Sequence, residues 1–419
     1  MGGALKVAFI NTLYKPNEIG GAERAVRTIA EALVARGHEA VVISLDPTGK
    51  GGQQVIEGVK VYYVPLANIH WPHAPQEARP AWRGAIWHLF DAYNVVMGAR
   101  LRRILRAEQP DVVEANNLQG FSVAAWRAAD RLGIPVVQVL HDYYLGCTSS
   151  AMFTRGRNCT QQCFKCKVYA TPRRLLSHIP RTVSSVSRRT LQRVEQTGMF
   201  ERVPRKVIVP SAFDANQQVE PRADKPPGSR LTLGFLGRID QTKGIEVLLR
   251  AIRALPPEKV TLLIAGSGVP AYVDDLKQRH AAPNIQFLGF TDPATFFARI
   301  DALVVPSVWE DPLPRVIFEA FAFGVPPMVS RIGGMPEIVS HGETGYVFEP
   351  DDPRALTQLL GELIERGLPA QRLSIAGRAR SQRFSVEDVF RSHMQSWTDA
   401  IASRSRPTPQ PTDQLEVRR

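Results

Sequence analysis

The sequence has no apolar stretch long enough to form an ordinary transmembrane helix. No run of 18 or more apolar residues occurs in its 419 residues, and crossing a bilayer takes about 20. The first twelve residues are also too short in their apolar part, and too soon polar, to resemble a secretory signal. These two absences predict a cytoplasmic protein.

Acidic residues are outnumbered by basic ones. The chain carries 52 Lys and Arg against 40 Asp and Glu, a formal net charge of +12. Such an excess favours anionic partners, namely nucleotide phosphates, nucleic acid or an anionic membrane face. No nucleic-acid-binding motif accompanies the charge, so we expect no nucleic-acid partner.

Cysteine is scarce, and its four copies lie in one short segment. They are Cys147, Cys159, Cys163 and Cys166, the last three spaced C-x3-C-x2-C. In a reducing compartment such a cluster binds a metal more often than it forms disulfides, and four thiolates suffice for tetrahedral zinc. The second C-x2-C pair of common zinc patterns is missing. A structural zinc site therefore stands beside free thiols or a disulfide as an alternative, and a catalytic zinc is not expected.

What the chain does contain is a repeated strand, loop and helix pattern. Short apolar strands alternate with segments of helical periodicity in residues 1–213 and again in residues 231–385. The first part includes a Cys-containing insertion near 145–180, and the polar, Pro-rich residues 214–230 read as a linker. Because the chain is too long for a single core, we predict an α/β protein with two Rossmann-like domains. A helix over 386–402 and a disordered tail over 403–419 follow.

The first domain offers two candidate ligand positions. Gly20 and Gly21 stand between an apolar strand (Lys6–Ile10) and a helix, where free N–H groups and bare backbone suit an anion. A plain tight turn is the alternative. His141 follows directly on an apolar strand, at the edge where open α/β sheets bind ligands. A purely structural histidine is the alternative there.

Residues 66–108 interrupt the alternation with interleaved aromatic and basic side chains. An acceptor surface or an amphipathic contact with an anionic membrane would fit this composition. A core helix with a solvated basic face fits it as well, and the pattern favours that interpretation. The residues concerned are Trp71, Trp82, Trp87, Phe90 and Tyr93, with Arg79, Arg83, Arg100, Arg102, Arg103 and Arg106.

The second domain begins with a cationic loop and a glycine loop. Arg238 and Lys243 stand in a Gly-flanked loop at the entrance of a helix, which predicts a clamp for a diphosphate. Gly266 and Gly268 follow the next strand in a G-x-G-x-x-A pattern. That pattern alone would allow a dinucleotide-dependent oxidoreductase, but Pro270 lies inside it and no acidic residue closes a following strand at the expected distance.

Residues 306–337 place two carboxylates beside a second glycine pair. Asp311 precedes a short helix and Glu319 lies about two turns inside it, while Gly333 and Gly334 form the loop after the next strand. These parts gather at one end of a β-α-β unit, where open sheets bind ligands. Asp311, directly before Pro312, also fits a helix N-cap.

Four segments together resemble the retaining glycosyltransferases of family 4, which have the GT-B fold, and the resemblance covers nearly the whole chain. The segments are Gly20-Gly21, FLGRIDQTKG (235–244), IAGSG (264–268) and the PSVW…EA…GG-PE region (306–337). The resemblance implies two Rossmann-like domains facing a central cleft, and a C-terminal helix that crosses back to the first domain. It also implies a nucleotide-diphosphate sugar as donor.

The resemblance further assigns roles to the candidate residues. The family's Glu-x7-Glu pair is Asp311 and Glu319 here, which implies that Glu319 holds the ribose and Asp311 the donor sugar, with Glu310 as an alternative longer arm. By the same analogy Arg238 and Lys243 clamp the diphosphate, Gly20-Gly21 approaches it from the other domain, and His141 meets the sugar. Gly266 and Gly268 would lie near the base. Gly333 and Gly334 would bring backbone N–H groups to the sugar or phosphate.

The residue inventory also predicts the chemistry. No Asp-x-Asp motif occurs in the chain, so Arg238, Lys243 and the helix behind Gly21 are expected to stabilise the leaving diphosphate without a metal. No carboxylate pair suits a double displacement, which favours front-face attack with retention. We therefore expect a metal-independent hexosyltransferase that needs no cofactor for catalysis.

The expected acceptor is a glycan or a lipid-linked saccharide of cell-surface polysaccharide biosynthesis, with peripheral contact at the inner face of the membrane. Two alternatives share the fold. One is a sugar-nucleotide epimerase or phosphorylase. The other is a catalytically weak nucleotide-sugar-binding scaffold, which is suggested by Asp311 because it is shorter than the family's Glu.

Overall fold

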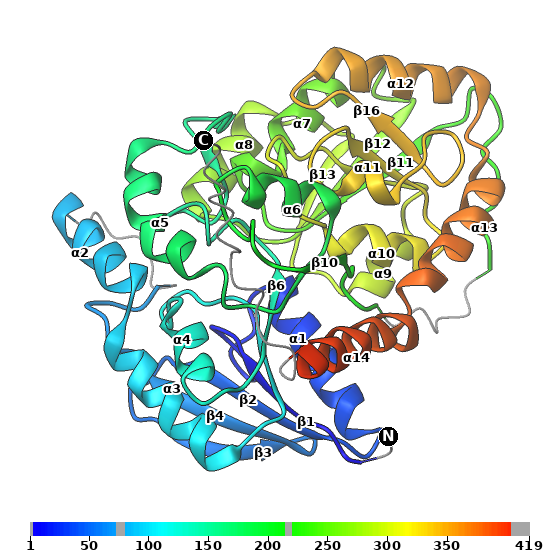
Figure 1. The fold of residues 1–419 in the computed structure, drawn as a ribbon. Helices are drawn as coiled ribbons and strands as arrows, with labels where there is room; N and C mark the ends of the chain where they lie inside the picture. The colour runs from blue at the N-terminus through cyan, green and yellow to red at the C-terminus, as the bar shows by residue number, and fades with distance from the viewer. Residues whose placement is uncertain (1–2, 73–79, 214–219, 404–419) are drawn as a thin grey trace, which may run out of the picture.

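Two open β-sheets organise the protein, one in each half of the chain (Figure 1). The computed structural model describes residues 3–72, 80–213 and 220–403. The predicted α/β fold with two Rossmann-like domains is confirmed. Most of the predicted tail, and residues 214–219 of the predicted linker, lie outside the described residues. No helix in the described part of the chain is both long and apolar enough to cross a bilayer.

The first sheet has eight strands in the order β10-β9-β6-β5-β1-β2-β4-β3. Every neighbouring pair is parallel except β3–β4, a hairpin at the edge. The strands are β1 (Lys6–Ile10), β2 (Glu39–Asp46), β3 (Gly52–Ile56), β4 (Val59–Pro65), β5 (Val112–Ala115), β6 (Val136–Leu140), β9 (Thr182–Ser185) and β10 (Arg205–Ile208). Its helices are α1 (Gly21–Val34), α2 (Ala81–Ala92), α3 (Val95–Glu108), α4 (Ala124–Asp130), α5 (Phe164–Leu176) and α6 (Arg188–Glu195). The insertion contributes α5 and a small hairpin, β7 (Phe153–Thr154) with β8 (Arg157–Asn158).

The second sheet has six parallel strands in the order β13-β12-β11-β14-β15-β16. They are β11 (Leu231–Leu236), β12 (Val260–Ala265), β13 (Ile285–Gly289), β14 (Ala302–Val305), β15 (Pro327–Ser330) and β16 (Tyr346–Phe348). The helical segments are η1 (Gln241–Lys243), α7 (Ile245–Arg253), α8 (Pro270–Arg279), α9 (Pro293–Ala298), α10 (Arg315–Ala322), α11 (Met335–Ile338), α12 (Pro353–Arg366), α13 (Ala370–Ser381) and η2 (Gln382–Phe384). In both sheets strand order reverses beside the first strand, which marks the ligand-binding edge.

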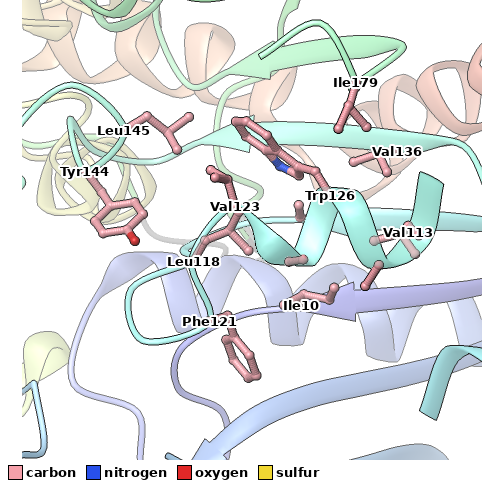
Figure 2. Close-up of a cluster of buried hydrophobic side chains, with 14 of the residues drawn as sticks. Ile10, Val113, Leu118, Phe121, Val123, Trp126, Val136, Tyr144, Leu145 and Ile179 are labelled. Atoms are coloured by element: carbon pink, nitrogen blue, oxygen red, sulfur yellow. The ribbon is translucent and has the colours of Figure 1, made fainter. Parts of the chain in front are cut away.

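Continuous apolar strands explain the cores, because parallel strands are covered by helices on both faces. In the first domain Trp126 of α4 packs over β5 and β6, near Val113 and Val136 (Figure 2). Trp126 is fully buried, and its Nε1–H donates to Gln138 Oε1 at 2.8 Å. The indole therefore fills the core while its polar atom keeps a partner.

The last helix, α14 (Val386–Ala402), joins the first domain, which confirms the predicted crossing (Figure 1). Trp397 of α14 is fully buried against Phe9 of β1, with ring centroids 5.8 Å apart. His393 Nδ1 and Trp397 Nε1 each lie 2.8 Å from Oε2 of Glu114, a buried residue of β5. At the joint between the domains the Phe213 N–H donates to Phe384 O at 2.9 Å, so the two chain segments that cross lie side by side.

Replacement of Trp397 with Ala is expected to lower the free energy of unfolding by about 3–5 kcal/mol, because it removes a fully buried indole and leaves the Glu114 carboxylate short of a donor. Chemical denaturation followed by circular dichroism measures the loss. Phe290→Ala is the matched control: Phe290 is 92% exposed, and its loss should change stability by no more than about 0.5 kcal/mol. Equal stability of Trp397→Ala and the native chain would contradict the docking of α14.

Candidate active site

The loop after β11 carries the two predicted cations. Asp240 caps η1 and accepts hydrogen bonds from the backbone N–H of Thr242 (2.9 Å) and Lys243 (3.2 Å). Gly244 follows with φ +68°, and a Cβ there would collide with the carbonyl oxygen of Pro306. The loops after the neighbouring strands β11 and β14 are therefore packed directly together at the ligand-binding edge of the second sheet.

The two cations differ in how firmly they are held. Lys243 Nζ forms an ion pair with Asp311, whose side chain is only 7% exposed. The same ammonium lies 5.5 Å from the ring centre of Trp309. Arg238 pairs with Asp240, but its side chain is 67% exposed. Lys243 is thus paired with a buried carboxylate, whereas Arg238 is paired with Asp240 at an exposed position.

The four predicted glycines of this domain allow the loops to approach one another. Gly266 and Gly268 pack against the carbonyl groups of Gly237 and Ile239, with no room for a Cβ. Gly333 (φ +61°) packs in the same way against Asp311. The Gly334 N–H donates to Asp311 O at 2.9 Å, so that N–H already has a partner within the protein. Gly334 therefore helps to hold the Asp311 backbone in place.

Glu310 does not supply the longer arm that the sequence allowed. Its carboxylate pairs with two arginines of α6, Arg189 and Arg193, the latter through Nε at 2.6 Å. Its backbone N–H donates to Asn158 Oδ1 (2.9 Å), and its carbonyl accepts from Tyr143 Oη (2.8 Å). Glu310 therefore binds the first domain, while the adjacent Asp311 turns towards Lys243.

Glu319 lies half-buried within α10, in a cationic setting that sequence reasoning missed. Burial raises its pKa above the usual range, against the opposing charges of Arg315 and Arg24. A Cβ on Gly21 would lie 3.0 Å from Arg315 Cδ, so the start of α1 meets the start of α10 across the domains. Arg315 and Glu319 are four residues apart in a predicted helix and are therefore neighbours on its surface, so this spacing could have identified Arg315 from the sequence.

His141 is held by a buried hydrogen-bonded chain. Its Nε2 lies 2.8 Å from Asn116 Oδ1, and Asn116 Nδ2 donates to Glu114 Oε1 at 3.2 Å. Burial alone would raise the pKa of Glu114, but His393, Trp397 and Asn116 outweigh it and hold that pKa below its usual range. An ionised carboxylate only accepts, which fixes the Asn116 amide and makes His141 Nε2 the protonated nitrogen. Sequence reasoning did not single out Glu114, Asn116 or His393.

Of the alternatives that the cysteine spacing left open, the structure shows free thiols. Cys147 Sγ and Cys166 Sγ approach to 3.9 Å, while Cys159 is half-buried and Cys163 exposed. Among the described residues no group of three or more His, Cys, Asp or Glu side chains is arranged to share a metal ion. A structural zinc is therefore not supported. The thiol of Cys166 instead lowers the pKa of Cys147, to about 5.

Comparisons with known proteins agree on one family. Residues 20–210 match the family described as Glycosyl transferase 4-like domain, and residues 230–366 match Glycosyl transferases group 1. An uncharacterised 42.6 kDa protein of the cps region of Klebsiella pneumoniae is 27% identical, covering 80% of this chain and 87% of the relative. A GDP-mannose-dependent alpha-mannosyltransferase of Mycolicibacterium smegmatis is 26% identical, covering 89% and 93%.

Solved structures share the fold over nearly the whole chain. Anabaena Alr3699/HepE, solved in complex with UDP and glucose, has a TM-score of 0.68 at 21% identity, covering 94% of this chain and 99% of its own. Sucrose-phosphate synthase of Thermosynechococcus elongatus has a TM-score of 0.72 at 19% identity, covering 95% and 100%. At these identities the likeness shows the two-domain GT-B fold and nothing finer.

We expect His141 to remain neutral at physiological pH, because burial lowers its pKa to about 4, below the ordinary 6.5. Since the unfolded chain then binds more protons between pH 6.5 and 4, the free energy of unfolding contributed by His141 falls as the pH drops through that window. Two-dimensional NMR of 15N-histidine protein should show the Nε2–H tautomer unchanged from pH 8 to 5.5.

Asn116→Asp provides the complementary variant, since it places a carboxylate against Nε2 and should raise the pKa of His141 by about 1 to 3 pH units. His141→Gln identifies the resonance. A His141 ring that titrates near pH 6.5 in the native protein, or a Nδ1–H tautomer, would contradict the hydrogen-bonded chain.

Proposed function

The chain belongs to the glycosyl transferases group 1, and we propose that it moves a sugar from a nucleotide-diphosphate sugar to a hydroxyl acceptor with retention of anomeric configuration. The bond between the anomeric carbon and the diphosphate oxygen breaks, and the acceptor oxygen bonds the same carbon. The proton of the acceptor hydroxyl leaves with the diphosphate. The pairing of Lys243 with Asp311, together with the exposed Arg238 in the same loop, is the observation that carries the proposal.

Arg238 and Lys243 bind the diphosphate and stabilise its charge as it leaves. A lysine ammonium has three donors, so Lys243 can keep Asp311 and still donate to a phosphate oxygen. Arg238 offers a planar, bidentate fork from an exposed position. The absence of an Asp-x-Asp motif supports these cations as the stabilising groups, so transfer is proposed to proceed without a metal ion or other cofactor.

The remaining candidates divide the donor between them. Glu319 is proposed to hold the ribose; the charge of Arg315 favours its ionised form, against the burial that raises its pKa. Asp311 and the neutral His141 are proposed to contact the sugar hydroxyls. Gly20 and Gly21, at the start of α1, approach the diphosphate from the first domain, while Gly266 and Gly268 line the side of the base. Gly333 and Gly334, which pack closely against the backbone of Asp311 and Pro312, are proposed to lie beside the sugar or phosphate.

The proposed acceptor is a glycan or a lipid-linked saccharide of cell-surface polysaccharide synthesis, used by a cytoplasmic protein at the inner face of the membrane. The cps-region relative supports a polysaccharide product. The donors named for relatives include GDP-mannose, and UDP-glucose is bound in a structural neighbour. The base and sugar are therefore best found by screening.

Nucleotide sugars should stabilise the protein against heat, in line with their affinity. With the best donor, Arg238→Met and Lys243→Met should each weaken binding by about 10- to 150-fold, the loss expected for a charge-assisted hydrogen bond. Thermal shift and calorimetric titration measure both effects. Arg354→Met, on the exposed start of α12, is the control and should bind like the native protein. Native binding by Lys243→Met would contradict the clamp.

Asp311→Asn should lower kcat by about 10- to 100-fold with little change in donor affinity, because it removes the charge beside Lys243 but keeps the shape. Asp311→Glu, which restores the family's usual residue, should remain active. NMR of the product should show a retained anomer, with turnover unaffected by a chelator. An inverted anomer would overturn the retention claim, and turnover that needs no acceptor would favour an epimerase.

A further inference from the structure

Exposed large apolar side chains gather on α2 and α5 of the first domain. Of the fourteen that the described residues contain, six belong to these two helices. Those on α5 are Phe164 (82% exposed), Val168 (51%) and Leu175 (67%). Those on α2 are Trp82 (62%), Leu89 (66%) and Phe90 (49%). Apolar surface gathered in this way marks an interaction site more often than isolated exposed residues do.

The apolar side chains of each helix share one face. Phe164, Val168 and Leu175 recur at i, i+4 and i+11, while Cys166, Ala170 and Arg173 of the same helix are buried. In α2 the residues Trp82, Leu89 and Phe90 recur at i, i+7 and i+8, opposite the buried Trp87 and Asp91. Both helices are therefore amphipathic, with the apolar stripe turned outward.

The two helices form one rigid unit. Tyr169 Oη donates to Ala85 O at 3.2 Å, and its ring lies 5.5 Å from that of His88. One helical turn further along, Arg173 pairs with Asp91 at 3.0 Å. Contacts thus advance together along both helices, which run parallel at one edge of the molecule (Figure 1). Since their buried faces point inward, the two stripes lie on the same outer side.

The charge on this surface has a single sign. No acidic residue occurs in α5, and Asp91, the one acid of α2, is fully buried against Arg173. The exposed charges of the two helices are cations: Arg83, Lys165, Lys167 and Arg174. Exposed aromatic and aliphatic side chains flanked by cations, without carboxylates, match the interface of an anionic bilayer, where the apolar groups enter the acyl boundary and the cations meet phosphates.

The surface is joined directly to the candidate active site. Tyr144 lies three residues after His141, and its Oη donates to Asp91 Oδ2 at 2.7 Å. The Arg173 guanidinium lies 4.0 Å from the centre of the Tyr144 ring. The buried Asp91, Tyr144 and Arg173 therefore lock α2 and α5 to the loop that follows His141.

We propose that the outer face of α2 and α5 docks on an anionic phospholipid bilayer, with α5, from the Cys-containing insertion, as its main apolar contact. This deepens the proposed function, on which it rests for the identity of the acceptor, and it places a lipid-carried acceptor beside the loop of His141. Of the exposed cations of these two helices, only Arg83 belongs to the set that the sequence pattern emphasised; Arg100 of α3, also in that set, binds the Pro65 carbonyl within the protein.

Vesicle sedimentation without any nucleotide sugar tests the surface independently of transfer. The full chain should bind vesicles of phosphatidylethanolamine and phosphatidylglycerol, and bind phosphatidylcholine vesicles far more weakly. The combined change Lys165→Gln, Lys167→Gln and Arg174→Gln should weaken binding by about 100-fold, at about tenfold or less per cation. Phe164→Ser with Val168→Ser and Leu175→Ser should weaken it by at least as much.

Matched controls lie elsewhere on the molecule. Val269→Ser with Phe290→Ser and Ile375→Ser removes three apolar side chains of similar exposure (69%, 92% and 55%) from the second domain. Lys50→Gln with Arg299→Gln and Arg383→Gln removes three exposed cations. Both controls should bind vesicles as the native chain does. Brominated lipids should quench Trp fluorescence, and Trp82→Phe should lose part of that quenching.

The proposal would be overturned by no binding to anionic vesicles, by equal binding to phosphatidylcholine, or by equal losses in the controls. A dimer in sedimentation velocity that the α5 changes dissociate would overturn it in favour of a second copy of this chain. Failure of the proposed function is separable, since it would abolish transfer while vesicle binding persists. If both hold, the α5 variants should transfer to a soluble acceptor at the native rate and lose only transfer to vesicle-borne acceptor.

Discussion

The Glu114 carboxylate is the constraint on which both the fold and the site depend. A buried, ionised carboxylate is tolerable only with several donors, and its partners come from distant parts of the chain: His393 and Trp397 on the last helix, and Asn116 beside it. The same carboxylate that anchors α14 therefore orients Asn116, and through it His141. The candidate catalytic edge of the first domain is complete only when the last helix of the chain has docked.

Two adjacent acidic residues of the second domain, Glu310 and Asp311, have different partners at the site. Glu310 turns to Arg189 and Arg193 of the first domain, whereas Asp311 turns to Lys243 of the second. Separating the two domains would leave Glu310 without its arginine partners, whereas Asp311 would stay paired with Lys243. The domain contact and the donor clamp are thus held by neighbouring residues with separate partners, so that the clamp can stay formed while the contact is made and broken.

Local patterns in the sequence were enough for most of the parallel strands, the glycine loops and the cationic loop, since each depends on residues close together in the chain. Patterns of this kind do not reveal pairs such as His393 with Glu114, 279 residues apart. Nor do they reveal that Glu310 forms ion pairs with arginines of α6. The β3–β4 hairpin was missed although Glu57 and Gly58, both with positive φ, form its turn. The cysteine spacing likewise left zinc and free thiols open as alternatives, because spacing along the chain does not fix how four thiols converge. The periodicity of the α5 sequence indicates its apolar stripe. That this stripe lies beside the one on α2 could be learned only from the fold.

The paired crossing at Phe213 and Phe384 has a mechanical consequence. A single chain segment between two domains allows the domains both to twist and to bend relative to each other. Two segments joined side by side by a hydrogen bond bend together easily, whereas twisting must shear one segment past the other. The hydrogen bond between the Phe213 N–H and the Phe384 carbonyl therefore favours bending over twisting as a relative motion of the two halves.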